Sequence, residues 1–148
     1  MNKPVFILNG PNLNLLGTRE PEIYGRETLA DVERRLEAVA GELGVDVEFV
    51  QRNGEGELVE CIQALRGRAD GAVINAGAYS HTSLAIHDAF RAVNVPYVEV
   101  HISNIFAREP ERRHSTLAGG AVALLCGFGT YGYELALRGL VARLAARG

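Results

Sequence analysis

The apolar segment 96–101 ends in two ionisable side chains, Glu99 and His101. In a β-strand, residues two apart point to the same side, so this carboxylate can hold or polarise this imidazole. A buried parallel strand is expected to be apolar on both faces, so a paired acid and base at its end indicates a functional site. The alternative is a structural ion pair or a solvent-exposed strand end.

A phenol and a guanidinium, Tyr24 and Arg19, stand in the long loop 9–25. A phenol has an ordinary pKa of about 10 and is a weak base at neutral pH, but a nearby guanidinium favours the phenolate. Such a phenolate could take one proton from a ligand while His101 supplies another. The alternative for Tyr24 is an aromatic ring that packs against the body of the protein.

Asparagine and histidine side chains follow the ends of two other apolar segments. Asn9 and Asn12 come after the segment 5–8, Asn75 closes the segment 71–75, and His81 lies on the loop that follows. Ligands of open α/β sheets bind at the carboxyl ends of the strands. We therefore expect these side chains to meet over one crevice.

The loop after residue 101 is rich in arginine, whose planar guanidinium binds carboxylates bidentately. Arg108 and Arg112 are four apart and share a face if the loop turns helically there, which suits a small anionic substrate. Arg113 and His114 fit a solvated loop.

His87 and Asp88 fall within a helix pattern and fit a solvent-exposed or subunit-contacting face. The spacing of His81 and His87 does not match the three or four residues that separate metal ligands on a helix. We expect no metal.

The periodicity of the chain predicts how these residues are held. Thr28 caps a helix whose apolar residues recur every three or four positions up to Gly44, and residues 45–50 alternate as an edge strand does. Helices are also predicted after residues 53–57, with Leu58, Ile62 and Leu65 inside, at 84–93 and at 132–146. Strands are predicted at 5–8, 45–50, 71–75, 96–101 and 121–126. This alternation predicts an α/β fold over 1–148, a single flavodoxin-like domain with a doubly wound five-stranded parallel sheet in the order 2-1-3-4-5.

The composition is that of an ordinary globular protein. The 148 residues are 47% hydrophobic and 22% charged, with a net charge of −3. This mild acidity does not suit a general nucleic-acid or anionic-membrane surface, although it allows a local cationic pocket.

No apolar run is long enough to span a bilayer and no targeting segment precedes the first strand, so a cytoplasmic location is expected. Cys61 and Cys126 are interpreted as reduced core thiols.

Several common activities lack their motifs. There is no G-x-x-x-x-G-K-[ST] phosphate loop, and the loop after the first strand has neither the G-x-G-x-x-G of dinucleotide binders nor the Ser/Thr-rich loop expected of a flavin mononucleotide carrier. Lys3 is the only lysine and is expected to lie far from the crevice, which argues against imine catalysis.

Taken together, the motifs resemble type II 3-dehydroquinate dehydratase, an enzyme of the shikimate pathway. They are G-P-N-L-N-L-L-G-x-R-E-P-x-x-Y-G (10–25), N-x-G-x-x-x-H-T-S-x-A-x-x-D (75–88), P-Y-x-E-V-H-I-S-N (96–104), A-R-E (107–109), R-R-H-S (112–115) and G-x-x-G-Y-x-x-A-L (129–137). The resemblance implies a flavodoxin-like fold, no metal or cofactor, and loss of water from 3-dehydroquinate by anti elimination through an enolate.

The resemblance also implies a role for each matching residue. Tyr24 takes the C2 proton with Arg19 beside it, His101 protonates the departing hydroxyl, and Glu99 orients His101. Asn12 helps to stabilise the enolate, and the residues implied to hold the substrate are Asn75, His81, Ile102, Ser103 and Arg112. Asp88 is implied to reach the site of a neighbouring subunit in a trimer, four of which form a dodecamer.

Three departures from the family pattern fall on the arginine-rich loop. Pro110 and Glu111 stand where an aromatic residue usually precedes R-R-H-S, Thr116 replaces a bulkier residue, and Phe106 replaces a common histidine. They leave the predicted acid and base in place. A non-catalytic flavodoxin-like module that binds a small molecule is the alternative function, and it has no need of an acid and a base.

Overall fold

The computed structural model describes residues 2–18 and 20–147, and of Tyr24 it describes only the backbone. Its centre is one sheet of parallel strands in the order β2-β1-β3-β4-β5. The strands are β1 (Val5–Asn9), β2 (Val47–Gln51), β3 (Gly71–Asn75), β4 (Tyr97–His101) and β5 (Ala123–Cys126). The predicted flavodoxin-like strand order is confirmed.

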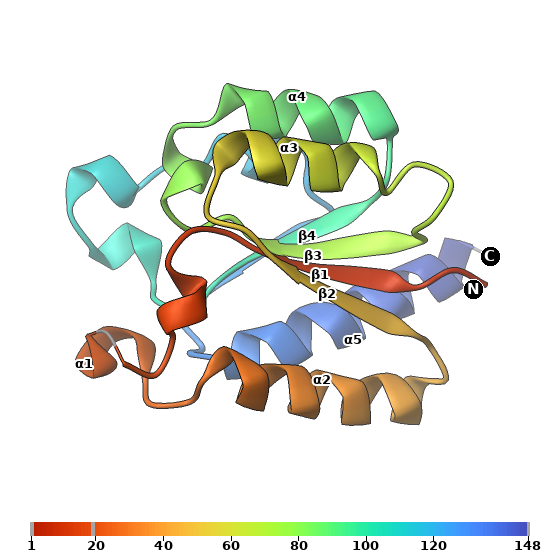
Figure 1. Ribbon diagram of the computed structural model, residues 1–148, viewed down its shortest axis with the longest axis horizontal. Coiled ribbons are helices and arrows are strands. Elements are labelled where there is room, and N and C mark those ends of the chain that lie inside the picture. The colour runs from red at the N-terminus through yellow and green to blue at the C-terminus, as the bar shows by residue number, and fades with distance from the viewer. Residues whose placement is uncertain (1, 19, 148) are drawn as a thin grey trace.

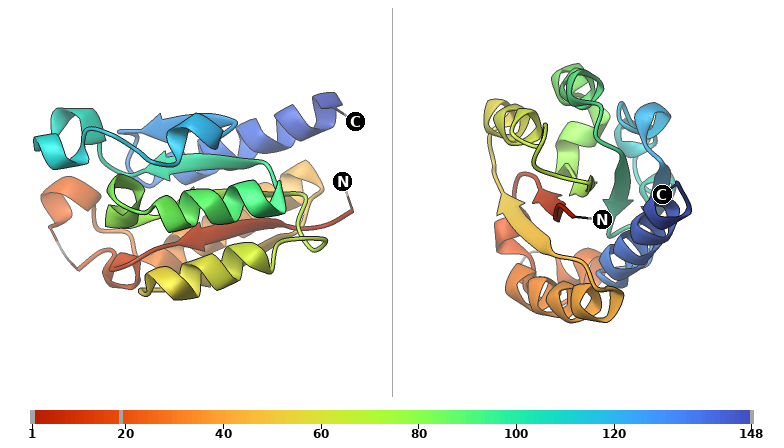
Figure 2. Two further views of the ribbon diagram at one scale, coloured as in Figure 1. Left: turned by 90° about the horizontal axis from the view of Figure 1, so that it is seen from above. Right: turned by 90° about the vertical axis from the view of Figure 1, so that its right-hand side faces the viewer.

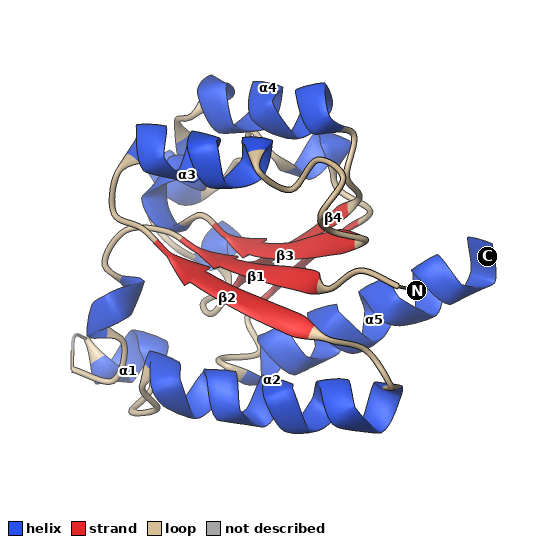
Figure 3. Ribbon diagram, turned by 45° about the vertical axis from the view of Figure 1, so that its right-hand side comes forward, coloured by secondary structure: helices blue, strands red, loops and turns tan. Residues whose placement is uncertain are grey.

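Helices cover both faces of this sheet. α3 (Glu55–Gln63) and α4 (Leu84–Val93) lie on one face, and α2 (Leu29–Leu43) and α5 (Tyr131–Arg147) lie on the other, as Figures 1 and 2 show from three sides. The short α1 (Pro21–Tyr24) lies beyond the carboxyl ends of the strands, at the same end of the molecule as the loop after β4. Figure 3 shows the resulting three layers.

The alternation of side chains along the strands divides the core into two clusters. In β4, Val98 and Val100 lie in the cluster under α2 and α5, while Tyr97 lies in the cluster under α3 and α4. Side chains two apart share a side, so Glu99 and His101 point the same way as Tyr97. The cores therefore set the direction in which the predicted acid and its partner face.

The predicted caps form as their sequence chemistry requires. The Thr28 side chain accepts from the Asp31 amide while the Asp31 carboxylate accepts from the Thr28 amide, which makes a complete capping box. Gly44 ends the helix with a left-handed backbone, φ 69°. These signals are local, which is why the sequence places the start and end of α2 correctly.

The structure corrects several element bounds. β1 extends through Asn9 instead of ending at Leu8. β2 begins at Val47 because the Val45 amide bonds the Ala40 carbonyl at 3.0 Å and so belongs to the helix end. β5 begins at Ala123, after the 3-10 turn Ala118–Gly120.

Two predictions of burial are also wrong. Cys61 and Cys126 are free, as expected, but both are only partly buried and are not core residues.

Among residues 2–18 and 20–147, no helix has both the length and the hydropathy that crossing a membrane requires.

Candidate active site

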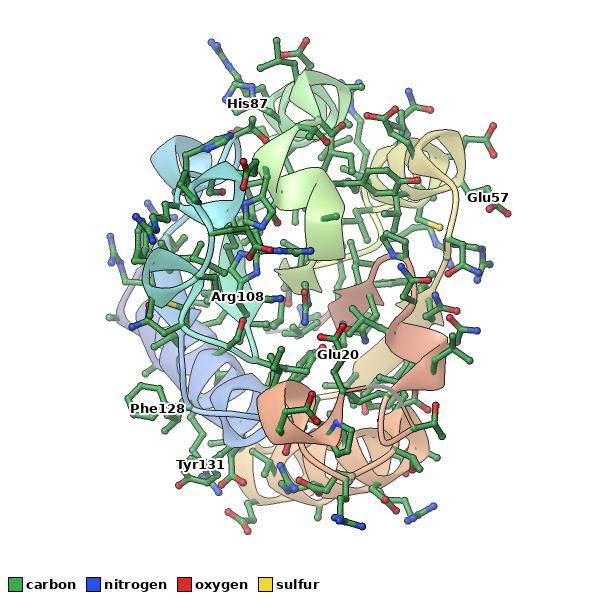
Figure 4. All side chains as sticks on the ribbon, turned by 90° about the vertical axis from the view of Figure 1, so that its left-hand side faces the viewer. Glu20, Glu57, His87, Arg108, Phe128 and Tyr131 are labelled. Atoms are coloured by element: carbon green, nitrogen blue, oxygen red, sulfur yellow. The ribbon has the colours of Figure 1, made fainter. Side chains whose placement is uncertain are left out.

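A cavity opens at the carboxyl ends of β1, β3 and β4. Its volume is about 550 Å³ when the open mouth of the cavity is included. The residues that line it are Pro11, Asn12, Leu13, Asn75, Gly77, Ala78, His81, His101, Ile102, Ser103, Ile105, Arg108 and Arg112. Figure 4 looks onto this end of the molecule: Arg108 and Glu20 lie toward the middle of the view, and His87 and Glu57 at its edge. The structure thus brings together the predicted Asn12, Asn75, His81, His101, Ile102, Ser103 and Arg112.

Glu99 and His101 form a buried pair at the edge of the cavity. Glu99 Oε2 and His101 Nε2 are 2.5 Å apart, and the two residues are 0% and 5% exposed. The prediction that they share one side of β4 is confirmed. Since Nε2 is bound to Glu99, the other ring nitrogen of His101, Nδ1, is left to serve a ligand.

The Glu99 carboxylate has a second partner that sequence reasoning missed. The Ser115 hydroxyl lies 2.7 Å from Oε1 and 2.8 Å from Oε2 of Glu99. Ser115 belongs to the R-R-H-S motif, and a small hydroxyl residue that ends a charged loop is the signal that could have drawn attention to it. Only the fold shows that it returns to β4.

His81 lies over His101 and is fixed by His114. The rings of His81 and His101 are stacked with centroids 5.9 Å apart. His81 Nδ1 is 2.7 Å from the His114 carbonyl, and His114 Nε2 is 2.7 Å from the His81 carbonyl. His114 is exposed, as the prediction of a solvated loop expects, but this reciprocal pair also ties its loop to the loop after β3.

Burial is the main cause that lowers the pKa of His81, and the nearby His101, Arg112 and His114 add to it. The imidazole is therefore neutral near pH 7. With Nδ1–H donated to the His114 carbonyl, Nε2 is an acceptor for a ligand hydroxyl.

Asn75 is held by a tyrosine from the last helix. Asn75 Nδ2 donates to the Tyr133 hydroxyl at 3.0 Å, and that hydroxyl donates to Asn9 Oδ1 at 2.5 Å. The Gly77 amide donates to Asn75 Oδ1 at 3.1 Å, which fixes the orientation of the amide. Asn9 was expected to face the crevice, but it is 1% exposed and is committed to Tyr133.

The loop after β1 passes very close to the loop after β3. A Cβ on Gly10 would lie 2.5 Å from the Ala76 carbonyl oxygen, so only glycine fits there. Asn12 follows with φ 70°, a left-handed conformation that asparagine tolerates, and its amide donates to Asn53 Oδ1 at 3.0 Å. Leu13 and Leu16 are buried beneath this turn.

The second half of the loop is exposed where the structure describes it. Glu20, Pro21, Glu22 and Ile23 are all exposed. Beyond it, Glu27 pairs with Arg35 on α2 and accepts a hydrogen bond from Thr130, the residue that precedes α5. Both partners stabilise the carboxylate and lower the pKa of Glu27, with the Thr130 hydrogen bond the largest cause.

Arg19 and the side chain of Tyr24 lie outside the described residues. The backbone of Tyr24 ends α1, which forms part of the same loop. The assignment of Tyr24 as base and of Arg19 as its partner therefore stays a prediction.

Two of the three arginines of the loop after β4 line the cavity. The short 3-10 helices Ile105–Ala107 and Pro110–Arg112 turn the chain so that Arg108 and Arg112 reach the same site. Arg108 lies 3.3 Å from the Ser103 hydroxyl, and Arg112 forms an ion pair with Glu109 at 3.0 Å. The substitution at Pro110 and Glu111 thus still leaves Arg112 at the cavity.

Asp88 does not line the cavity of its own chain. Its side chain is 77% exposed on α4, 3.2 Å from His87 Nδ1. Within the described part of the chain, no group of three or more His, Cys, Asp or Glu side chains could hold a metal ion.

Comparisons with known proteins agree with this geometry. The family profile described as Dehydroquinase class II matches residues 3–141. The chain is 59% identical over 140 residues to a protein of Gemmatimonas aurantiaca named 3-dehydroquinate dehydratase, which covers 95% of this chain and 92% of that protein.

Solved structures give the same result. The type II dehydroquinase from Propionibacterium acnes superposes with a TM-score of 0.90 at 44% identity, covering 96% of this chain and 98% of that one. The type II dehydroquinase from Butyrivibrio crossotus superposes with a TM-score of 0.91 at 38% identity, covering 93% and 97%. With its profile, its relatives and its fold in agreement, the chain belongs to the class II dehydroquinase family of enzymes.

Proposed function

We propose that this enzyme dehydrates 3-dehydroquinate to 3-dehydroshikimate, by anti elimination through an enolate. The observation that carries the proposal is the buried pair of Glu99 and His101, which opens onto a cavity lined by amide, hydroxyl and guanidinium groups. A site that only binds a ligand needs no acid held in this way. Membership of the class II dehydroquinase family supports the same reaction.

His101 is the acid in this scheme. The Glu99 carboxylate favours the imidazolium over the neutral ring, because an opposite charge within a few ångström stabilises the charged form. With Nε2 bound to Glu99, the proton leaves from Nδ1 to the departing C1 hydroxyl of the substrate. Glu99 does not take up that proton and acts by orienting and charging the ring.

Tyr24 is the base that takes the C2 proton, and Arg19 keeps it a phenolate. The support is the family pattern in residues 10–25 and the place of α1 at the cavity end of the molecule. A guanidinium beside a phenol stabilises the phenolate, which makes the group a usable base near neutral pH.

The remaining polar groups bind the substrate. Asn12 stabilises the developing enolate, as a preorganised donor does for charge that appears in a transition state. Arg112 takes the carboxylate, a match of charge and shape for a guanidinium. The substrate hydroxyls are left to Asn75, His81, Ile102 and Ser103, all of which line the cavity.

A turnover assay tests the proposal directly. The product contains a conjugated enone, so ultraviolet absorbance should rise when 3-dehydroquinate is added to the protein. The rate should be unchanged after treatment with sodium borohydride in the presence of substrate, because no imine forms. Binding of substrate without any rise in absorbance would instead favour a non-catalytic binding module.

We also propose that the chain, as a single catalytic domain, assembles into trimers, four of which form a dodecamer, and that Asp88 serves a neighbouring subunit of its trimer. The supporting observation is that Asp88 is exposed and lies off the cavity of its own chain. Light scattering should give twelve times the chain mass of 16.0 kDa. A cytoplasmic location stays a prediction.

Mixed assembly tests the role of Asp88. Two variants, Asp88→Ala and Tyr24→Phe, are unfolded together and refolded as a mixture. Hybrid sites that combine an intact Asp88 from one chain with an intact Tyr24 from another should raise activity above the mean of the separate variants. Activity equal to that mean would show that Asp88 does not act across subunits.

A further inference from the structure

The hydroxyl of Ser115 has four hydrogen-bonding neighbours. It lies 2.7 and 2.8 Å from the two oxygens of Glu99, 3.0 Å from the Leu117 amide and 3.1 Å from the Ala118 amide. A serine hydroxyl has one proton to donate and two lone pairs to accept with. All of its hydrogen-bonding capacity is therefore used.

The direction of each bond follows from the chemistry of the partners. Backbone amides only donate, so Leu117 and Ala118 occupy both lone pairs of the hydroxyl. The single proton of Ser115 is left for Glu99, which must accept it. A proton on Glu99 has no acceptor on the serine side and can be shared only along the short contact with His101.

The hydrogen bond from Ser115 favours one of two positions for the proton between Glu99 and His101. The proton can lie on the imidazole, giving a charged pair, or on the carboxyl, giving a neutral pair. A hydrogen bond donated to a carboxylate stabilises its charged form, and Glu99 has no exposure to water that could do the same. Donation by Ser115 therefore shifts the proton toward His101.

We propose that Ser115 is a positioning residue that holds Glu99 as an anion and thereby keeps the proton of their contact on His101 Nε2, so that the ring is an imidazolium able to deliver its Nδ1 proton. The inference rests on the proposed role of His101 as the acid. Ser115 does not line the cavity and acts only through Glu99.

Other titratable groups surround the pair, and substitution of Ser115 leaves them in place. Tyr97, on the same strand, donates its hydroxyl to the Leu117 carbonyl at 2.6 Å, and burial, helped by the charge of Glu99, raises its pKa to about 12. From the other elements, His81 stacks on His101, and Arg108 and Arg112 line the same cavity. These groups act on the proton of His101 equally in the wild type and in a Ser115 variant, so a difference between the two proteins reports on Ser115.

The adjacent residue provides a matched control. The Thr116 hydroxyl anchors the same segment, with contacts of 3.2 Å to the Ser80 carbonyl and 3.1 Å to the Ser83 carbonyl. Ser115→Ala and Thr116→Val each remove one hydroxyl from this segment, but only Ser115 contacts Glu99. If Ser115 only holds its segment in place, Ser115→Ala and Thr116→Val should change the titration of His101 and the pH profile of kcat to a similar extent.

The first measurement is independent of turnover. The chain has 4 histidines, so histidine-labelled protein gives few NMR signals, and that of His101 is assigned by its loss in His101→Gln. We expect the pH midpoint of the His101 signal to fall by about one unit in Ser115→Ala and to stay unchanged in Thr116→Val. An unchanged midpoint in Ser115→Ala would overturn the proposal.

The second measurement is the pH profile of kcat. An acid must be protonated to act, so kcat falls as pH rises, and this basic limb should move to lower pH in Ser115→Ala. At pH 8, kcat should fall about tenfold while KM changes little, because Ser115 does not contact the substrate. A uniform loss with no movement of the limb would mean a structural role.

If Ser115→Ala does not fold, Ser115→Cys answers the same question. A thiol is a weaker donor, so the His101 midpoint should move in the same direction by a smaller amount. No movement in this variant contradicts the proposal. If the wild-type protein does not turn over 3-dehydroquinate, the proposed function fails, while the NMR comparison still decides whether Ser115 controls the proton on His101.

Discussion

The two sides of the cavity are built differently. On the β4 side, Glu99 and His101 are buried and joined to Ser115, and the loops around them are bonded to one another. On the side of α1, residues 20–23 are exposed, and the backbone bonds described there are local ones, such as the Ile23 amide to the Glu20 carbonyl at 2.9 Å. Under our proposal, the acid belongs to the first side and the base to the second.

This difference suggests a division of roles in the reaction. A group fixed by packing and several hydrogen bonds is already in its reactive geometry, whereas a segment with little burial opens at a small free-energy cost. The loop is anchored at both ends, by Leu13 and Leu16 before α1 and by Glu27 after it. We expect closure of the part between these anchors to set the rate of turnover.

The largest effect should come from the chemistry on the α1 side. Tyr24→Phe removes the proposed base and should lower kcat by about a thousandfold or more, since general-base catalysis contributes about 10²–10⁴. Binding of substrate should remain measurable by calorimetry. If the rate is unchanged, Tyr24 is not the base, and the assignment of the base to the α1 side of the cavity is wrong.

The next effect should come from the buried network beneath the other side. Tyr133→Phe leaves Asn9 Oδ1 and Asn75 Nδ2 without their buried partner, at a cost of about 1–3 kcal/mol in the free energy of unfolding. Because Asn75 then keeps only the hydrogen bond from the Gly77 amide, it is held less firmly and KM should rise about tenfold. Tyr131→Phe is the control, since Tyr131 is 52% exposed on the same helix; similar losses in both variants would contradict this role.

A smaller effect is expected from a change in the backbone of α1, which should lower the rate of turnover without lowering the stability of the fold. Pro21 is the first residue of α1, where its fixed φ favours the helical turn, and Pro21→Gly should lower kcat several-fold with little change in Tm. Ala38→Gly, at an exposed position within α2, should do the opposite, by lowering Tm without lowering kcat. If kcat and Tm fall together in Pro21→Gly, the segment is structural and not a gate.

The smallest effect concerns the pH dependence of stability. The pKa of His81 is lowered in the fold from an ordinary 6.5, mainly by burial, so the unfolded chain binds a proton at a higher pH than the folded one does. The resulting stability is complete above pH 6.5 and is lost as pH falls through the pKa of the folded state. Urea unfolding at pH 7 and pH 5, at one protein concentration, should show a smaller decrease for His81→Gln than for the wild type. An equal decrease in the two proteins would show that His81 does not contribute to the pH dependence of stability.

Most of the fold could be predicted because its signals are local. The apolar runs, the Thr28 cap and the left-handed Gly44 are set by neighbouring residues, and these gave the elements and their order. The errors arose where a contact from elsewhere intervened. Val45 has the alternating pattern of a strand, but its amide is used by the preceding helix end.

The candidate site likewise has features that neighbouring residues determine and features that depend on distant contacts. The spacing of Glu99 and His101 fixed their common side, because strand geometry depends only on neighbouring residues. Pairing with Ser115, 16 residues away, and support of Asn75 by Tyr133, 58 residues away, depend on how distant segments pack. No local pattern encodes such contacts.

The sequence by itself therefore determined which residues bear the chemistry, on which strands and loops they stand, and which family they resemble. Only the tertiary structure decided which hydrogen bonds fix them: that Ser115 turns its proton toward Glu99, that His114 sets the tautomer of His81, and that Tyr133 orients Asn75. The physical reason is that the type and spacing of residues are properties of the chain, whereas the state of a buried proton depends on partners that only packing brings within 3 Å.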